Sequence, residues 1–126
     1  MNEIDPYKDI KFEVRNVKII GKDNNIVFEE NVEFPIDFDD NAAAIVASRY
    51  LCNDSKNKET SLKTLFDRVS ETIATWGQDL GYFETKKEHY ERDEKDNLCN
   101  KLKCYQMNRY FAFNSPVYFN VGLQDL

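Results

Sequence analysis

Three cysteines, one histidine and one serine followed by proline are the residues whose types could carry chemistry in this sequence. Cys99 and Cys104 are five residues apart, which on a helix places them about 140° from each other, so they would not share a face. Cys52 ends an apolar stretch and is typical of a small buried side chain. These positions favour neither a metal site nor a redox pair. The single histidine, His89, lies in a polar stretch and is expected to be solvated.

Ser115, which Pro116 follows, has the strongest case for a functional role. Proline biases the residue before it to an extended backbone, and the serine hydroxyl with nearby backbone N–H groups could then meet an anion. Asn114 and Ser115 also fit an ordinary turn, in which Asn and Ser side chains bond the local backbone. The residues alone leave both interpretations open.

The elements that would position these residues begin with a β-hairpin over residues 12–34. In the first strand the apolar residues change from even-numbered to odd-numbered positions between Val14 and Val17, which predicts a bulge near Asn16. Residues 21–25, GKDNN, tolerate positive φ and form the expected turn. Alternation along the second strand places apolar side chains on one face. Those side chains are Ile26, Phe28, Val32 and Phe34.

Two helices are expected to follow, once Pro35 has ended the second strand. Asp39 or Asp40 can cap the first, DNAAAIVASRYL, whose alanines allow close packing. Thr60 or Ser61 can cap the second, which carries an amphipathic stripe with spacings of three and four. The stripe comprises Leu62, Leu65, Phe66, Val69, Ile73, Trp76 and Leu80.

A third helix and a terminal strand complete the expected order. Gly81 marks the end of the second helix, and Thr85 and Glu88 have the spacing of a capping box for the third. Residues 117–121 alternate like a strand, which Gly122 ends. The third helix carries a partial apolar stripe at Leu98, Leu102, Tyr105 and Arg109.

Composition limits the class of protein. With 126 residues and a net charge of −6, the chain fits one domain and lacks the basic face that a nucleic-acid binder needs. Its longest apolar run, residues 42–47, is far shorter than the roughly 20 residues that cross a bilayer. The N-terminus is acidic and polar, unlike a secretory signal, and an odd number of cysteines indicates no disulfide framework. We therefore expect a cytoplasmic protein that binds neither nucleic acid nor membrane.

The run AFNSPVYFNVG, residues 112–122, resembles a segment of the adenosylcobalamin-dependent (class II) ribonucleotide reductases. Other pieces that resemble the family occur in the same order, namely the hairpin, the helix NAAAIVASRY, and WG followed by GYF after Arg68. The sequence departs from the family in three respects. Residues 86–109 are more charged, Tyr118 stands where the family often has Trp, and the chain ends before the family's catalytic cysteine.

The resemblance implies a fold and a division of the chain. The fold would be α+β and mainly helical, with the N-terminal hairpin, about three helices and a terminal strand that leads into a ten-stranded α/β barrel. Residues 1–111 would form the hairpin-and-helix region, and residues 112–126 the start of the barrel. The aromatic residues near the end would pack on the barrel, and in this chain alone they would form an exposed apolar patch. They are Tyr110, Phe111, Phe113, Tyr118 and Phe119.

The resemblance also implies an activity, the reduction of ribonucleotides to deoxyribonucleotides for DNA precursor synthesis, with adenosylcobalamin as cofactor. By this resemblance Ser115 contacts the phosphates of the ribonucleotide substrate and Asn114 shapes the loop, while no catalytic or metal-binding residue is assigned in this chain. The cofactor and the radical chemistry would belong to a partner, either a C-terminal reductase chain or the rest of a longer chain. This chain alone would then be inactive. The alternative is a non-catalytic binding or regulatory module derived from the same region.

Overall fold

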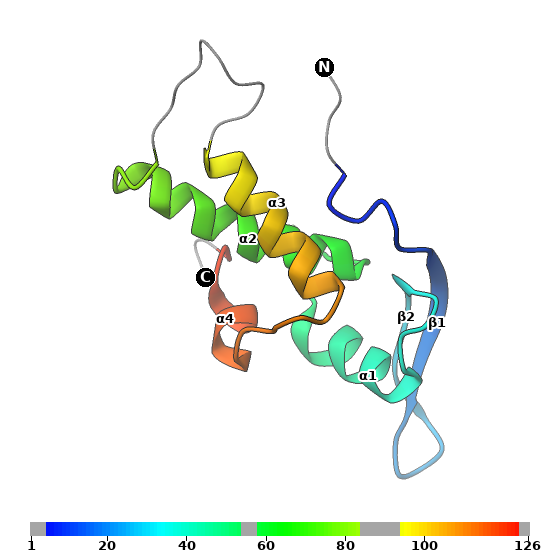
Figure 1. The fold of residues 1–126 in the computed structure, drawn as a ribbon. Coiled ribbons are helices and arrows are strands. Elements are labelled where there is room, and N and C mark those ends of the chain that lie inside the picture. The colour runs from blue at the N-terminus through cyan, green and yellow to red at the C-terminus, as the bar shows by residue number, and fades with distance from the viewer. Residues whose placement is uncertain (1–4, 54–57, 84–93, 124–126) are drawn as a thin grey trace. The chain divides into compact units, whose positions relative to one another are not determined.

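The structure, a computed structural model, describes residues 5–53, 58–83 and 94–123, and shows a β-hairpin followed by helices (Figure 1). This order confirms the predicted α+β class. No helix in these three ranges has both the length and the hydrophobicity to cross a bilayer. The elements are β1 (Phe12–Ile20), β2 (Ile26–Pro35), α1 (Asp40–Ile45), η1 (Val46–Tyr50), α2 (Leu62–Asp79), α3 (Glu94–Met107) and α4 (Ser115–Asn120).

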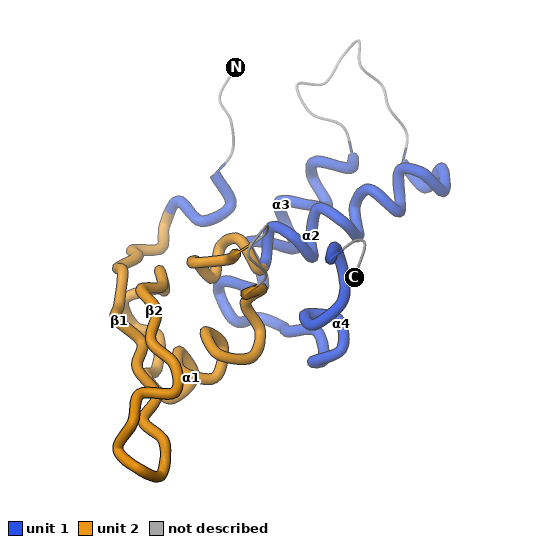
Figure 2. The backbone as a smooth tube through the Cα atoms, turned by 180° about the vertical axis from the view of Figure 1, so that it is seen from behind, with its two compact units in different colours: residues 1–8, 66–126 blue, residues 9–65 orange. Residues whose placement is uncertain are grey.

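The chain forms two compact units, and residues 9–65 are one of them (Figure 2). Its hairpin pairs β1 and β2 antiparallel. The predicted turn is confirmed, because the Gly21 N–H donates to the Asn25 carbonyl at 2.8 Å and Asn24 has a positive φ of 59°. Side chains alternate along each strand, so one face of the hairpin is buried, as predicted. The buried residues of this face are Val17, Val32 and Phe34.

The bulge predicted near Asn16 is wrong. Asn16 lies opposite Asn31 and their side-chain amides hydrogen-bond at 3.0 Å, so the register there is regular. Val14, counted as an inner residue, is 69% exposed, and Arg15 lies opposite the buried Val32 on the inner face instead. The phase of the strand therefore does not slip near Asn16, and the register shift of the hairpin lies between Ile19 and Ile20 instead. An inward arginine interrupts the apolar alternation of β1.

Arg15 can occupy this inner position because main-chain oxygens surround its guanidinium group. The group donates hydrogen bonds to the carbonyls of Pro35 (3.0 Å), Ile36 (2.9 Å) and Phe38 (2.7 Å), and it pairs with the Asp40 carboxylate at 3.2 Å. The planar fork of an arginine suits several acceptors at once, while its stem covers apolar surface. One side chain thus fixes the path from the end of β2 to the start of α1.

The first helix begins where the sequence predicts. The Asp39 carboxylate accepts the Ala42 N–H at 3.1 Å and caps α1. The helix continues into η1, a wider turn in which the Leu51 N–H donates to the Val46 carbonyl, five residues earlier, at 3.0 Å. The predicted helix over residues 40–51 is therefore confirmed, with its last turn widened.

Ser61 is the residue that caps α2. Its hydroxyl accepts the Lys63 N–H at 3.1 Å and donates to the Glu33 carboxylate at 2.7 Å. The Glu33 N–H in turn donates to the Thr60 carbonyl at 2.8 Å, which joins β2 to the start of the helix. The stripe of α2 is buried in its first part, whereas Trp76 is 51% exposed.

The other unit comprises residues 1–8 and 66–126, and in it α3 lies beside α2 (Figures 1 and 2). The stripe predicted for α3 is wrong. Its buried residues are Cys99, Gln106 and Met107, and the Lys103 side chain is only 12% exposed. Cys99, Lys103 and Gln106 follow one another at helical spacings of four and three. Of the predicted stripe, Leu98 and Leu102 are half-buried, and Tyr105 and Arg109 are exposed.

The inner face of α3 can include a charged residue, Lys103, because α2 supplies partners for it. The Lys103 ammonium lies 2.9 Å from the Glu71 carboxylate and 3.3 Å from that of Asp67. Pairing makes the burial of such a charge tolerable. The capping box predicted at Thr85 and Glu88 lies outside the described residues.

The terminal strand predicted over residues 117–121 is wrong, because this segment is part of the helix α4. Pro116 lies in its first turn, where the missing N–H needs no partner and the fixed φ suits a helix. The buried and half-buried side chains of Tyr118 and Val121 are three residues apart, which is helical spacing. The ten-stranded barrel that this segment would enter stays a prediction.

We expect Arg15→Met to lower the free energy of unfolding by about 2 kcal/mol, because three carbonyls lose a charged donor. Arg49→Met, which changes an exposed arginine, is the matched control and should stay within about 0.5 kcal/mol of the parent. Urea unfolding followed by circular dichroism measures both. Equal effects of the two substitutions would contradict the role assigned to Arg15.

Candidate functional site

The predicted site residues lie at the start of α4. Asn114 precedes the helix with extended dihedrals, φ −73° and ψ 164°, and its side chain makes no capping bond. Ser115 is the first helical residue, so the extended position is one residue earlier than Pro116 predicts. Asn114 is exposed and Ser115 is half-buried. The two residues are therefore adjacent at a surface turn that leads directly into a helix.

A buried chain of hydrogen bonds connects this turn to α2 and α3. The Tyr118 hydroxyl accepts the Phe113 N–H at 3.1 Å and donates to the Gln106 side-chain carbonyl at 2.7 Å. The Gln106 amide nitrogen donates to the Ser70 hydroxyl and to the Leu102 carbonyl, both at 2.9 Å. Tyr118 is 6% exposed and Gln106 is 3% exposed, so these bonds are shielded from water.

Arg68 of α2 holds the other end of α4. Its guanidinium group donates to the carbonyls of Tyr118 (2.9 Å) and Val121 (2.6 Å). These carbonyls lie at the helix C-terminus, where backbone acceptors lack helical partners and a cation is favourable. Gly122 follows with a φ of 83°, and a Cβ built there would lie 2.6 Å from both Arg68 Cγ and Thr72 Oγ1. The close approach of α4 to α2 thus requires glycine.

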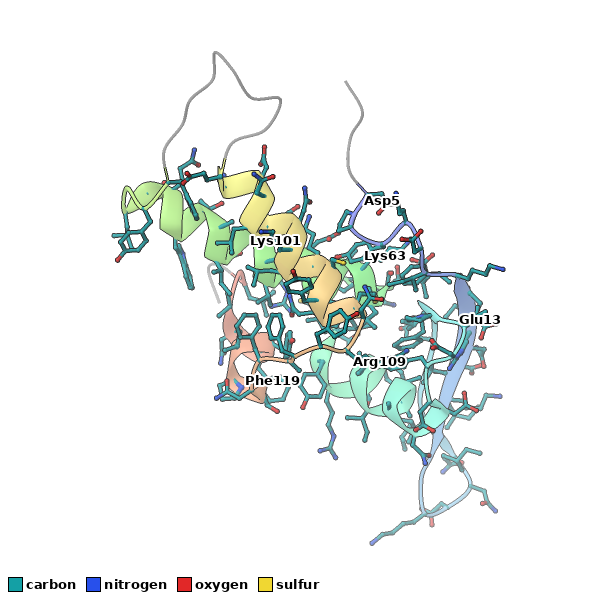
Figure 3. All side chains as sticks on the ribbon, in the orientation of Figure 1. Asp5, Glu13, Lys63, Lys101, Arg109 and Phe119 are labelled. Atoms are coloured by element: carbon teal, nitrogen blue, oxygen red, sulfur yellow. The ribbon has the colours of Figure 1, made fainter. Side chains whose placement is uncertain are left out.

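The aromatic residues around the turn form a partly buried group. The rings of Phe66 and Phe113 lie 6.0 and 6.1 Å from the Tyr118 ring, centroid to centroid. The expectation of an exposed patch is wrong for Tyr118, which the chain's own helices enclose. Of the other four, Tyr110 is 76% exposed and Phe119 on α4, labelled in Figure 3, is 41% exposed, whereas Phe111 and Phe113 are half-buried.

A second polar cluster anchors the N-terminal segment of this unit. The buried Tyr7 hydroxyl donates to the Asp67 carboxylate at 2.6 Å. Burial, and then the hydrogen bond to Asp67, raise the pKa of Tyr7 well above its usual value of 10. For Lys103, burial opposes the charged form, but the hydrogen bond to Glu71 and the charge of Asp67 outweigh burial and raise its pKa. The cluster is therefore a neutral phenol beside a charged lysine and two carboxylates.

The cysteines show no arrangement for catalysis. Burial raises the pKa of Cys99, an effect that Lys103 only partly offsets, so its thiol is neutral rather than a thiolate nucleophile. Cys104 is half-buried and its sulfur accepts the Asn108 amide at 3.4 Å. In the part of the chain that the structure describes, no three His, Cys, Asp or Glu side chains gather to hold a metal ion. His89 lies outside that part.

Sequence reasoning missed Gln106 and Lys103, and it noted Arg68 only as part of a resemblance. A usable signal exists for the first two. Together with Cys99 they recur at intervals of four and three, the spacing of one helix face, within a helix whose apolar residues form no continuous stripe. A polar residue at such a position indicates a buried polar contact.

Comparison with known proteins gives a consistent result. Residues 13–96 match the family model described as class II vitamin B12-dependent ribonucleotide reductase. A Rhodopirellula baltica protein named vitamin B12-dependent ribonucleotide reductase is 35% identical over 122 residues, which cover 94% of this chain and 11% of that protein. Proteins of the same name from Streptomyces coelicolor and Streptomyces clavuligerus are 33% and 32% identical, over 94% of this chain and 12% of each. No solved structure matches.

The coverage has two consequences. The chain spans only 11 to 12% of the length of these relatives. Because 94% of the chain is aligned, the aligned region necessarily includes Asn114 and Ser115, which lie beyond the part that the family model matches.

We expect the free energy of unfolding to fall with rising pH above about 10 through Tyr7. The raised pKa means that the folded state holds the phenol proton more tightly than the unfolded state. This stabilisation is complete below the unfolded pKa and is lost as the pH rises through the folded value. Urea unfolding from about pH 8 to 11 should show a shallower decline for Tyr7→Phe than for the parent. Tyr110→Phe, at an exposed tyrosine, should decline like the parent, and a parental decline in Tyr7→Phe would contradict the assignment.

Gly122→Ala should lower the free energy of unfolding by about 3 kcal/mol, because a left-handed backbone and close contacts with Arg68 and Thr72 both oppose a Cβ. Gly81→Ala is the matched control. Gly81 has a similar φ of 78° but open space around a Cβ, so only the backbone cost of about 1 kcal/mol remains. Thermal and urea unfolding compare the two variants. Equal losses would show that α4 does not approach α2 as closely as described.

Proposed function

Since this chain belongs to the class II vitamin B12-dependent ribonucleotide reductases, we propose that it supplies the N-terminal scaffold of such an enzyme and one edge of its ribonucleotide pocket. The observation that carries the proposal is the family match over residues 13–96, in a chain that spans only 11 to 12% of its relatives. The complete enzyme would reduce ribonucleotides to deoxyribonucleotides for DNA synthesis. This chain alone would be inactive, because the cofactor and the radical chemistry would belong to the rest of the enzyme, of which it spans 11 to 12%.

We place the phosphates of the substrate against the Ser115 hydroxyl, with Asn114 shaping the turn. Two observations support this placement. The turn lies at the surface, and the residues that follow it are held by Tyr118 and by Arg68. A donor on a fixed backbone loses little conformational entropy when it binds an anion.

Adenosylcobalamin would be bound by the rest of the enzyme. The chain spans 11 to 12% of its relatives, and the remaining residues of the enzyme would supply the cofactor site. The role that we assign to this chain is therefore limited to scaffold and substrate contact.

A regulatory or binding module without catalytic function is the second candidate. The burial of Tyr118 favours it, because this chain's own α2 and α3 already satisfy the terminal segment. Such a module would be ordered without a partner and would never support turnover.

Complementation separates the two candidates. The chain should be mixed with the Rhodopirellula baltica relative from which the aligned segment has been deleted, together with adenosylcobalamin, a dithiol reductant and a ribonucleotide. We expect deoxyribonucleotide formation that neither polypeptide gives alone. A mixture that binds the two chains together yet forms no deoxyribonucleotide would favour the regulatory module.

Ser115→Ala in the complemented enzyme should raise KM for the ribonucleotide about tenfold, because one hydrogen bond to a charged phosphate is lost. The value of kcat should change little, since the contact is the same in the ground and transition states. Ser48→Ala, at a half-buried serine of η1, is the control and should leave KM unchanged. An unchanged KM in Ser115→Ala would remove Ser115 from the substrate site.

A further inference from the structure

We propose that the Tyr118 hydroxyl, oriented by Gln106, is the group that positions the turn at Asn114 and Ser115 and so sets the affinity of that turn for a phosphate-bearing ligand. Tyr118 and Gln106 are then positioning residues that act through Ser115. The part that concerns phosphate rests on the proposed function. The part that concerns the backbone of the turn does not.

The Tyr118 hydroxyl links the residues before the turn to those after it. Tyr118 belongs to α4, which follows the turn, and its hydroxyl accepts the N–H of Phe113, which precedes the turn. The residues between them, 114–117, are therefore closed into a loop by this 3.1 Å bond. Within the loop the Val117 N–H donates to the Asn114 carbonyl, also at 3.1 Å.

Gln106 fixes the position of that hydroxyl. Its carbonyl oxygen accepts the Tyr118 proton at 2.7 Å, and its amide group cannot rotate away without losing the bonds to Ser70 and Leu102. Every buried side-chain nitrogen and oxygen of the described residues has a hydrogen-bond partner. A change in this chain of bonds would leave a buried group without one.

The chemistry of the position requires a group that both donates and accepts. A tyrosine hydroxyl does both, whereas phenylalanine does neither. Arg68 donates to carbonyls at the C-terminal end of α4, and its guanidinium group has no acceptor for the N–H of Phe113. Loss of the hydroxyl should therefore release the start of the turn while the end of α4 stays in place.

Amide hydrogen exchange, measured by NMR on the full chain, tests the backbone part directly. In Tyr118→Phe the Phe113 amide should exchange at least about tenfold faster than in the parent, relative to the Val17 amide of β1 as internal reference. Gln106→Met keeps a side chain of similar length and should give a smaller acceleration at the same amide. It also provides the test if Tyr118→Phe does not fold. Tyr110→Phe removes an exposed hydroxyl and should match the parent, and parental exchange at Phe113 in the folded variants would overturn the proposal.

The complemented enzyme tests the phosphate part. Tyr118→Phe should raise KM for the ribonucleotide about tenfold with kcat within about twofold, whereas a purely structural defect would lower the apparent kcat at unchanged KM and would overturn the proposal. The double variant with Ser115→Ala should have the KM of Ser115→Ala alone, because both changes remove the same contact. If Ser115→Ala raises KM and Tyr118→Phe does not, the positioning role fails and the proposed function stands. If Ser115→Ala itself leaves KM unchanged, the substrate assignment fails, and the exchange of Phe113 still decides the backbone part.

Discussion

The unit of residues 1–8 and 66–126 depends on one constraint: where its helices meet through buried polar groups, each of these groups needs its partner. The Gln106 side-chain amide is at the centre of this arrangement, since it forms hydrogen bonds with Ser70 of α2 and with Tyr118 of α4. A buried hydrogen bond contributes only about 1 kcal/mol net, but an orphaned partner costs about 1–3 kcal/mol. The bonds therefore select one arrangement of helices more strongly than they stabilise it.

The unit of residues 9–65 follows a related rule, although its contacts are different. Arg15 on the inner face of β1 donates hydrogen bonds to three main-chain carbonyls between the end of β2 and the start of α1. Arg68 in the other unit donates to two main-chain carbonyls at the end of α4. In both cases a guanidinium group takes the place of a helix cap or a turn residue. Main-chain oxygens disperse the charge, so a strand or helix of modest hydrophobicity can still be held in a defined place.

The sequence predicted those features that have local causes. The caps at Asp39 and Ser61 follow from side chains that bond a backbone N–H two or three residues later. The turn at residues 21–25 follows from residues that tolerate a positive φ, as Asn24 does. The inner positions of Arg15 and Gln106 were not predicted, because hydrophobic alternation ranks polar residues as exposed. Their partners are also distant, since Ser70 lies 36 residues from Gln106.

The same distinction explains the outcome at the candidate site. Ser115 could be singled out from its neighbour Pro116, but period-two alternation over residues 117–121 suggested a strand where proline in the first turn and the contact of Tyr118 with Gln106 produce a helix. The site that we propose would depend on an ordered backbone rather than on a reactive group. A segment that spans 11 to 12% of its relatives could make that contribution to a larger enzyme. In a larger enzyme the chain would keep the turn at Asn114 and Ser115 ordered before the substrate binds. A donor that is already ordered loses less conformational entropy when it binds an anion.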